Sequence, residues 1–164
     1  MDLNERFKAT LGSWASGVSV VTTRHDDLLY GITVSSFASV SLDPPLISIC
    51  IGNANRAAAI IEESGWFGVS VLSREQEEAS NYFARPGREP TPGFVEIDGA
   101  WTESGLPIVH GSLAWAVCDV HQAVPAGDHT LFIGRVTDAG HDPEGQPLIY
   151  WRRGYRSIEL PDIR

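Results

Sequence analysis

Short apolar runs separated by glycine, proline and aspartate occupy most of this chain, and they constrain its fold more than any other feature. The runs at 18–23 and 28–32 flank the turn-prone His25-Asp26-Asp27, which predicts a hairpin. Further runs of strand length lie at 46–51, 66–72, 112–123, 130–137, 148–151 and 155–158. Because strands do not alternate regularly with helices, we expect a mainly β protein, an antiparallel barrel with helical insertions.

Helical patterns are few. A first helix is expected to end near Gly17, with a capping box at Asp2 and Glu5 and one apolar face formed by Leu3, Phe7, Leu11 and Trp14. A second is expected over 57–61, and a third over 75–84 after a capping-box pattern at Ser73 and Gln76. Three prolines and two glycines in 85–93 predict a mobile loop that acts as a lid.

Length and charge exclude several function classes. The 164 residues suit a single domain over 1–164, and the net charge of -9 disfavours binding to nucleic acid or to an anionic membrane. No apolar stretch approaches the roughly 20 residues of a membrane-spanning helix, and the first residues do not follow a secretory signal pattern. Cys50 and Cys118 lie in apolar runs, which favours a soluble, cytoplasmic protein with reduced thiols.

Residues 33–45 are unusual because they contain four serines and a threonine between two apolar runs. One interpretation is a hydroxyl-rich loop that satisfies its own backbone. The other is a binding site, because small side chains with many short donors suit a flat, polar-edged ring or a phosphate.

Arg56 lies at the start of the second expected helix, where a cation opposes the positive end of the helix dipole. An anion held by Arg56, by Asn53 and Asn55 and by the free N–H groups of the helix would compensate. A solvated arginine on a surface helix is the alternative.

His129 lies in Gly127-Asp128-His129-Thr130 at the mouth of an expected strand, where it could meet a ligand or simply face solvent. Residues 150–156 concentrate aromatic and basic groups, which could stack on a nucleotide or form an ordinary strand pair. The sequence has no trusted zinc-ligand spacing, no G-x-S-x-G and no G-x-G-x-x-G, so we expect no metal site, hydrolase triad or Rossmann site.

Three ordered segments resemble the signatures of the flavin reductase-like domain family: Gly31 to Leu46 (GITVSSFASVSLDPPL), Gly127 to Gly134 (GDHTLFIG), and Pro147 to Tyr150 with Arg153-Gly154-Tyr155. The resemblance extends from Phe7 to about Ile158. It implies a split β-barrel of the FMN-binding-like type that forms a homodimer. It further implies that the protein binds FMN or FAD, takes hydride from NADH or NADPH, and supplies reduced flavin to a separate flavin-dependent monooxygenase.

The resemblance also implies residue roles. Thr33, Val34, Ser35 and Ser36 would meet the isoalloxazine and ribityl groups, and Ser41 would help toward the phosphate. The flavin would be bordered by Cys50, Ile51, Gly52 and Asn53, with Asn55 and Arg56 at its phosphate. His129 and Tyr155 would lie on the open face of the ring, where nicotinamide stacks. Members of the family often have a serine and a threonine at the phosphate-binding helix start, where this chain has Ala54-Asn55-Arg56-Ala57.

These inferences lead to one main hypothesis and two alternatives. The main hypothesis is a flavin reductase in which the protein supplies stacking geometry and hydrogen-bond donors to the pyrimidine edge of flavin, with no protein nucleophile. The first alternative is a flavoprotein that binds FMN tightly as an electron carrier or sensor, without turnover of NAD(P)H. The second is an interaction module that keeps the barrel and has lost its ligand.

Overall fold

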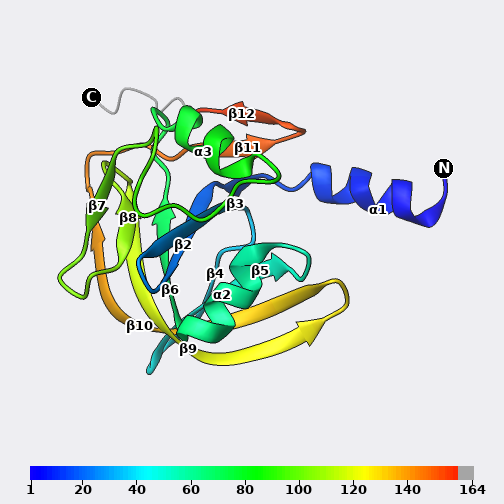
Figure 1. Cartoon of the computed structure of the whole chain (residues 1–164). Helices are drawn as coiled ribbons and strands as arrows, with labels where there is room; N and C mark the ends of the chain where they lie inside the picture. Colours follow the sequence, from blue (N-terminus) through cyan, green and yellow to red (C-terminus); the bar gives the residue numbers. More distant parts are fainter. Residues whose placement is uncertain (159–164) are drawn as a thin grey trace.

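The computed structural model describes residues 1–158, and most of its secondary structure is strand (Figure 1). Its helices are α1 (Leu3–Gly12), α2 (Arg56–Ser64) and α3 (Glu77–Ala84). Its strands are β1 (Ser16–Gly17), β2 (Ser19–His25), β3 (Leu28–Val34), β4 (Ala38–Leu42), β5 (Pro45–Gly52), β6 (Trp66–Val71), β7 (Gly99–Trp101), β8 (Pro107–Val109), β9 (Ala114–Ala126), β10 (His129–His141), β11 (Ile149–Trp151) and β12 (Gly154–Arg156). The prediction of a mainly β protein with helical insertions is confirmed.

The main sheet has the strand order β3-β2-β6-β9-β10-β5-β4, and all of its pairs are antiparallel. Strands β3 and β4 are the two edges, so the sheet is not closed into a barrel. A smaller sheet pairs β1 with β11 and β11 with β12. The expected hairpin is confirmed as β2 and β3, in which Ser19 lies opposite Val34 and the turn contains Asp26 at φ 53°.

Two apolar clusters hold helices against this sheet. Helix α2 buries Ala57, Ala58 and Ile61 against strand residues that include Phe67 and Phe132, both fully buried. Helix α3 buries Tyr82 and Phe83 in a second cluster with residues of β2 and the segment before β11. Burying a side chain of this size contributes about 1.5–3 kcal/mol, so each cluster fixes its helix firmly.

Helix α1 is different, because none of its residues is buried. The predicted capping box is confirmed, since Asp2 accepts from the Glu5 N–H and Glu5 accepts from the Asp2 N–H. The helix ends at Gly12 rather than near Gly17, where β1 already pairs with β11. It projects away from the rest of the molecule and leaves the predicted apolar face exposed (Figure 1).

Other expected elements are shifted or were missed. Helix α3 begins at Glu77 rather than 75, because the Gln76 side chain accepts from the Ser73 N–H and forms a turn before the helix. Strand β4 was expected to be part of a serine-rich loop, but its pairing with β5 makes it a strand. Its apolar residues alternate with serines and yet remain exposed, Val40 at 49% and Leu42 at 91%. The short pair β7 and β8 also lacks a distinct signal.

The segment expected to form a mobile lid is tied to the sheet. Leu29 and Thr91 exchange two backbone hydrogen bonds, with N···O distances of 2.6 and 2.9 Å, which attach the segment to the edge strand β3. The guanidinium of Arg88 donates to the Gly31 carbonyl and lies over the rings of Tyr82 and Phe83 at 4.7 and 4.9 Å.

No helix within residues 1–158 has both the length and the apolarity needed to cross a membrane.

Candidate functional site

A pocket of about 410 Å³ lies between β3, α3 and the β11–β12 pair. It brings Thr33, Val34 and Ser35 of the first motif next to Tyr155 of the third. Its volume is within the range of roughly 300–1,000 Å³ that ligand pockets occupy. The sequence-predicted residues from two distant motifs therefore share one cavity of a size that can accept a planar ring.

Helix α3 supplies hydrogen-bond partners for this pocket. Thr33 Oγ1 donates to the Ser80 carbonyl at 2.7 Å, and Ser80 Oγ lies 2.7 Å from the Tyr155 hydroxyl. That hydroxyl donates to Asn81 Oδ1 at 3.1 Å. We call Thr33, Ser80, Asn81 and Tyr155 the pocket wall. Ser80 and Asn81 were not singled out from the sequence, because a serine and an asparagine inside a helix give no signal of their own.

The seat of α3 on β3 depends on one glycine. A Cβ on Gly31 would come within 2.6 Å of the Phe83 ring, so only a residue without a side chain lets that ring lie against the strand. Phe83 is 3% exposed. The close approach of Gly31 and Phe83 places the Ser80 carbonyl within reach of Thr33, two residues along β3 from Gly31.

Tyr150 and Arg153 complete the other side of the pocket. The rings of Tyr150 and Tyr155 meet edge to face with centroids 5.4 Å apart. Arg153 has φ 60° at the turn between β11 and β12, which turns the chain back toward the pocket. The aromatic and basic cluster expected over 150–156 thus contributes both a ring pair and a cation to the pocket lining.

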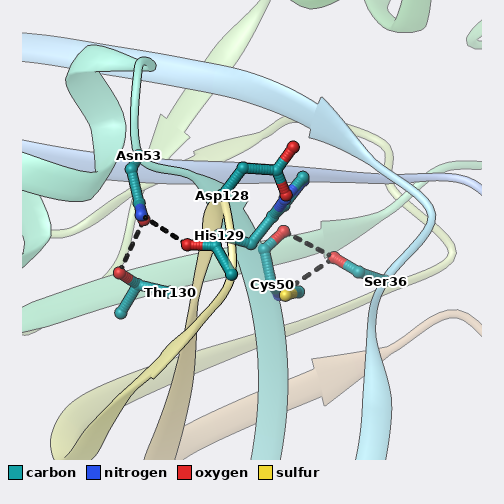
Figure 2. A network of polar contacts seen from close by, with 7 residues as sticks. Ser36, Cys50, Asn53, Asp128, His129 and Thr130 are labelled. Carbon is teal, nitrogen blue, oxygen red and sulfur yellow. Dashed lines mark hydrogen bonds and ion pairs between the residues drawn. The ribbon is translucent and has the colours of Figure 1, made fainter.

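A second group of polar side chains lies around the ends of β5 and β10 (Figure 2). It consists of Ser36, Cys50, Asn53, Asp128, His129 and Thr130, and we call it the rim cluster. Ser36 Oγ donates to the Cys50 carbonyl and accepts from the Cys50 N–H, both at 3.0 Å. Thr130 Oγ1 donates to Asn53 Oδ1 at 2.9 Å.

His129 is placed by the strand register and by its neighbour in the chain. It lies opposite Gly52 in the β5–β10 pairing, and its Nε2 is 3.7 Å from where a Gly52 Cβ would stand. Its Nδ1 lies 2.6 Å from Asp128 Oδ1. The hydrogen bond to His129, and then the charge of the imidazole, hold the pKa of Asp128 below its usual range. Asp128 thereby fixes the ring and leaves Nε2 available.

The start of α2 carries the predicted phosphate residues. Asn55 is the N-cap and uses its side chain to accept from the Ala57 N–H at 2.9 Å. Arg56 forms a bidentate ion pair with Glu89, with N···O distances of 2.8 and 2.9 Å. The pair is exposed, with side-chain exposures of 57% and 67%, so its two groups remain accessible to solvent.

The remaining predicted residues divide by burial. Gly52 is half-buried beside the His129 ring, and Cys50 is also half-buried. Ile51 is 1% exposed, so its side chain packs in the core and only its backbone can face a ligand. Ser41 lies in the edge strand β4, next to an irregularity in its pairing with β5. Within residues 1–158, no three His, Cys, Asp or Glu side chains gather to hold a metal ion.

A family model described as "Flavin reductase like domain" matches residues 11–159. An NADH-dependent flavin reductase from a Rhodococcus species is 38% identical over 156 residues, which cover 93% of this chain and 85% of the relative. The reductase component of 4-hydroxyphenylacetate 3-monooxygenase from Thermus thermophilus is 36% identical over 159 residues, which cover 97% of this chain and 99% of the relative.

The fold has a solved counterpart. The Streptomyces globisporus C-1027 NADH:FAD oxidoreductase SgcE6, in complex with NAD and FAD fragments, superposes with a TM-score of 0.90 at 32% sequence identity. The match covers 100% of this chain and 98% of that chain. The likeness therefore includes every element that lines the pocket.

Proposed function

The chain belongs to the flavin reductase-like domain family, and we propose on that basis that it is an NADH-dependent flavin reductase. One observation carries the proposal: a single pocket joins Thr33, Val34 and Ser35, which the family resemblance assigns to flavin, with Tyr155, which it assigns to nicotinamide. Two rings that exchange a hydride must stack, so residues for both belong in one cavity. The bound groups supply the chemistry, which is hydride transfer from nicotinamide C4 to flavin N5.

The residues of this chain orient the reactants and do not act as nucleophiles. The pocket wall offers hydroxyl oxygens at fixed positions, and Tyr150 and Tyr155 offer ring edges and faces. His129 presents Nε2 at the rim, with its ring held by Asp128. An open site of this kind suits a flavin that binds, is reduced and leaves.

The reaction is tested by NADH oxidation with added FMN or FAD. We expect the loss of NADH absorbance to require flavin, and to follow saturation kinetics in both substrates. NADPH, assayed in parallel, measures nucleotide preference. No flavin-dependent oxidation of NADH with either flavin would refute the proposal.

Arg56 offers a test of the proposed phosphate contact. An exposed ion pair is worth at most about 1 kcal/mol, so a phosphate can displace Glu89 from Arg56. We expect Arg56→Ala to weaken FMN binding up to about fivefold and to leave riboflavin, which has no phosphate, unchanged. Glu89→Gln frees Arg56 and should tighten FMN binding alone. Equal changes for FMN and riboflavin would contradict the assignment.

The product of this reaction is a reduced flavin that needs an acceptor. The Thermus thermophilus relative is named as the reductase component of a monooxygenase. We propose that reduced flavin passes from this protein to a flavin-dependent monooxygenase, and that both proteins work in the cytoplasm. Two free cysteines, one of them fully buried, are consistent with a reducing compartment.

We also propose that the protein is a homodimer in which a second copy covers α1. Each apolar residue on this face of the helix is more than half exposed, Leu3 at 72%, Phe7 at 58% and Leu11 at 55%, and so is Trp14 just after the helix, at 74%. An isolated ten-residue helix is marginal in water, so a helix that projects with its apolar face free needs a partner surface. Sedimentation should give twice the chain mass, and Phe7→Glu with Leu11→Glu should give the monomer. A monomeric wild type at micromolar concentration would contradict the proposal.

A further inference from the structure

The pocket wall has a definite pattern of hydroxyl protons. Asn81 Oδ1 can only accept, so the Tyr155 hydroxyl donates its one proton to that oxygen. The Ser80 hydroxyl, 2.7 Å from the same phenol oxygen, must then supply the proton of the second contact. Ser80 is fully buried, so its hydroxyl has little access to water as an alternative partner, whereas the contact between Tyr155 and Asn81 is exposed.

Thr33 on β3 shows the same pattern. Its hydroxyl proton goes to the Ser80 carbonyl at 2.7 Å. What Thr33 and Tyr155 still offer to the pocket is lone pairs. Helix α3 therefore converts two hydroxyl groups, which could in principle donate or accept, into acceptors. This departs from the sequence-based expectation that the hydroxyls near the flavin act as donors.

We propose that Ser80 and Asn81 are positioning residues that fix the phenol of Tyr155 as a hydrogen-bond acceptor, so that the pocket selects a ring bearing an amide-type N–H at that point. The inference rests on the proposed function, because both reactants of a flavin reductase carry such a group. The nicotinamide carboxamide has an N–H₂, and the isoalloxazine has an imide N–H at position 3. A carbonyl or phosphate oxygen at the same point would face only lone pairs.

Two pairs of probes separate the two sources of the N–H. NAD⁺ is compared with 3-acetylpyridine adenine dinucleotide, in which a methyl ketone replaces the carboxamide. Riboflavin is compared with 3-methylriboflavin, in which a methyl group replaces the imide proton. Calorimetry on the FMN-saturated protein gives the nucleotide affinities, and quenching of flavin fluorescence gives the flavin affinities.

In the wild type, one of the two pairs should show a preference of about fivefold to tenfold for the member with the N–H, the effect of one neutral hydrogen bond. The pair that shows it identifies the ring next to Tyr155. Tyr155→Phe should abolish that preference. Equal affinities within both pairs in the wild type would overturn the proposal.

Variants in α3 test whether Ser80 and Asn81 set the preference. Asn81→Asp keeps a side chain that can only accept from the Tyr155 phenol, so the preference for the probe with the N–H should remain. Ser80→Ala alone leaves the phenol donating to Asn81, so the preference should also remain. The double variant Ser80→Ala with Asn81→Leu frees the phenol proton, so the preference should fall to near one. A double variant that retains the wild-type preference would overturn the proposal.

Two controls separate a loss of folding from a loss of the preference at Tyr155. Thermal unfolding of each variant shows whether α3 stays folded, and the matched single variant Ser80→Ala carries the same buried change as the double variant. The binding ratios need no turnover. An absence of NADH oxidation would therefore refute the proposed function, while the ratios would still decide the inference about Tyr155.

Discussion

The pocket wall and the rim cluster hold their polar side chains by different means. In the wall, hydrogen bonds join β3 to α3 and α3 to β12, across 47 and 75 residues of sequence. In the rim, the β5–β10 register sets His129 opposite Gly52, and Asp128 orients it from the adjacent position. The wall therefore depends on how α3 packs on the sheet, whereas the position of His129 in the rim depends on the pairing of β5 with β10. A change that displaces α3 from β3 should break the hydrogen bonds of the pocket wall and leave the position of His129 unchanged.

The largest expected effect comes from Phe83→Ala. Phe83 anchors α3 on β3, where its ring lies over Gly31, and it is 3% exposed. Removing a buried aromatic ring costs about 3–5 kcal/mol, so the free energy of unfolding in urea should fall by that amount. The affinity for FMN should fall as well, because Ser80 loses its position relative to Thr33.

The matched control is Leu42→Ala in β4, whose side chain is 91% exposed. This variant should change the free energy of unfolding by less than about 0.5 kcal/mol. If Phe83→Ala left FMN affinity unchanged while destabilising the protein, the pocket wall would not depend on the seat of α3. The contrast between the two regions would then be wrong.

His129→Ala should have a smaller effect, and on catalysis rather than on folding. Its side chain is 47% exposed and packs on no buried cluster, so the free energy of unfolding should change little. We expect kcat/KM for NADH to fall about tenfold, the loss of roughly one strong contact to the nucleotide. Steady-state kinetics with FMN saturating provide the measurement. An unchanged kcat/KM would remove His129 from the proposed nicotinamide contact.

The sequence predicted the parts of this site that lie in continuous motifs. Thr33 and Tyr155 could be named because each belongs to a segment with a recognisable pattern, and the hairpin could be predicted from local residue preferences. The edge strand β4 was not predicted, because the serines and prolines of 33–45 favour a loop, although Ala38, Val40 and Leu42 alternate with Ser39 and Ser41 as in a strand.

The role of Ser80 was also beyond reach of the sequence. Its carbonyl and hydroxyl meet partners 47 and 75 residues away, and only the packing of α3 brings these atoms together. The same is true of Glu89, which pairs with Arg56 because the segment after α3 is tied to β3 at Thr91. Long-range hydrogen bonds of this kind depend on tertiary packing, for which a single sequence gives no local signal.

The two cysteines give a finer comparison between core and rim. Burial, and then the charge of Asp119, raise the pKa of the Cys118 thiol to about 12, so about one molecule in ten thousand is a thiolate at pH 8. Cys50 is half-buried in the rim cluster. A disulfide reagent should therefore modify one thiol per native chain, and saturating FMN should slow that reaction several-fold. Two thiols reacting equally, or no protection by FMN, would contradict the proposed placement of Cys50 beside the flavin.

The smallest expected effect is the loss of the contact between Asp128 and His129 at acidic pH. The hydrogen bond to His129, and then the charge of the imidazole, lower the pKa of Asp128. A lowered carboxyl pKa means that the contact is fully present above the ordinary range of aspartate and is lost only as the pH falls through the lowered value. The Asp128–His129 contact should therefore persist wherever the enzyme is assayed near neutrality.

Titration of the Asp128 carboxyl by NMR measures this directly. Its midpoint should lie below the ordinary value of about 3.9, and His129→Gln should move it upward, because a neutral amide is a weaker partner than an imidazolium. Asp128→Asn keeps a hydrogen-bond acceptor for Nδ1–H and removes the charge, so its effect on kcat/KM should be smaller than that of His129→Ala. If the two midpoints coincided, Asp128 would not orient His129, and the rim would depend on the strand register alone.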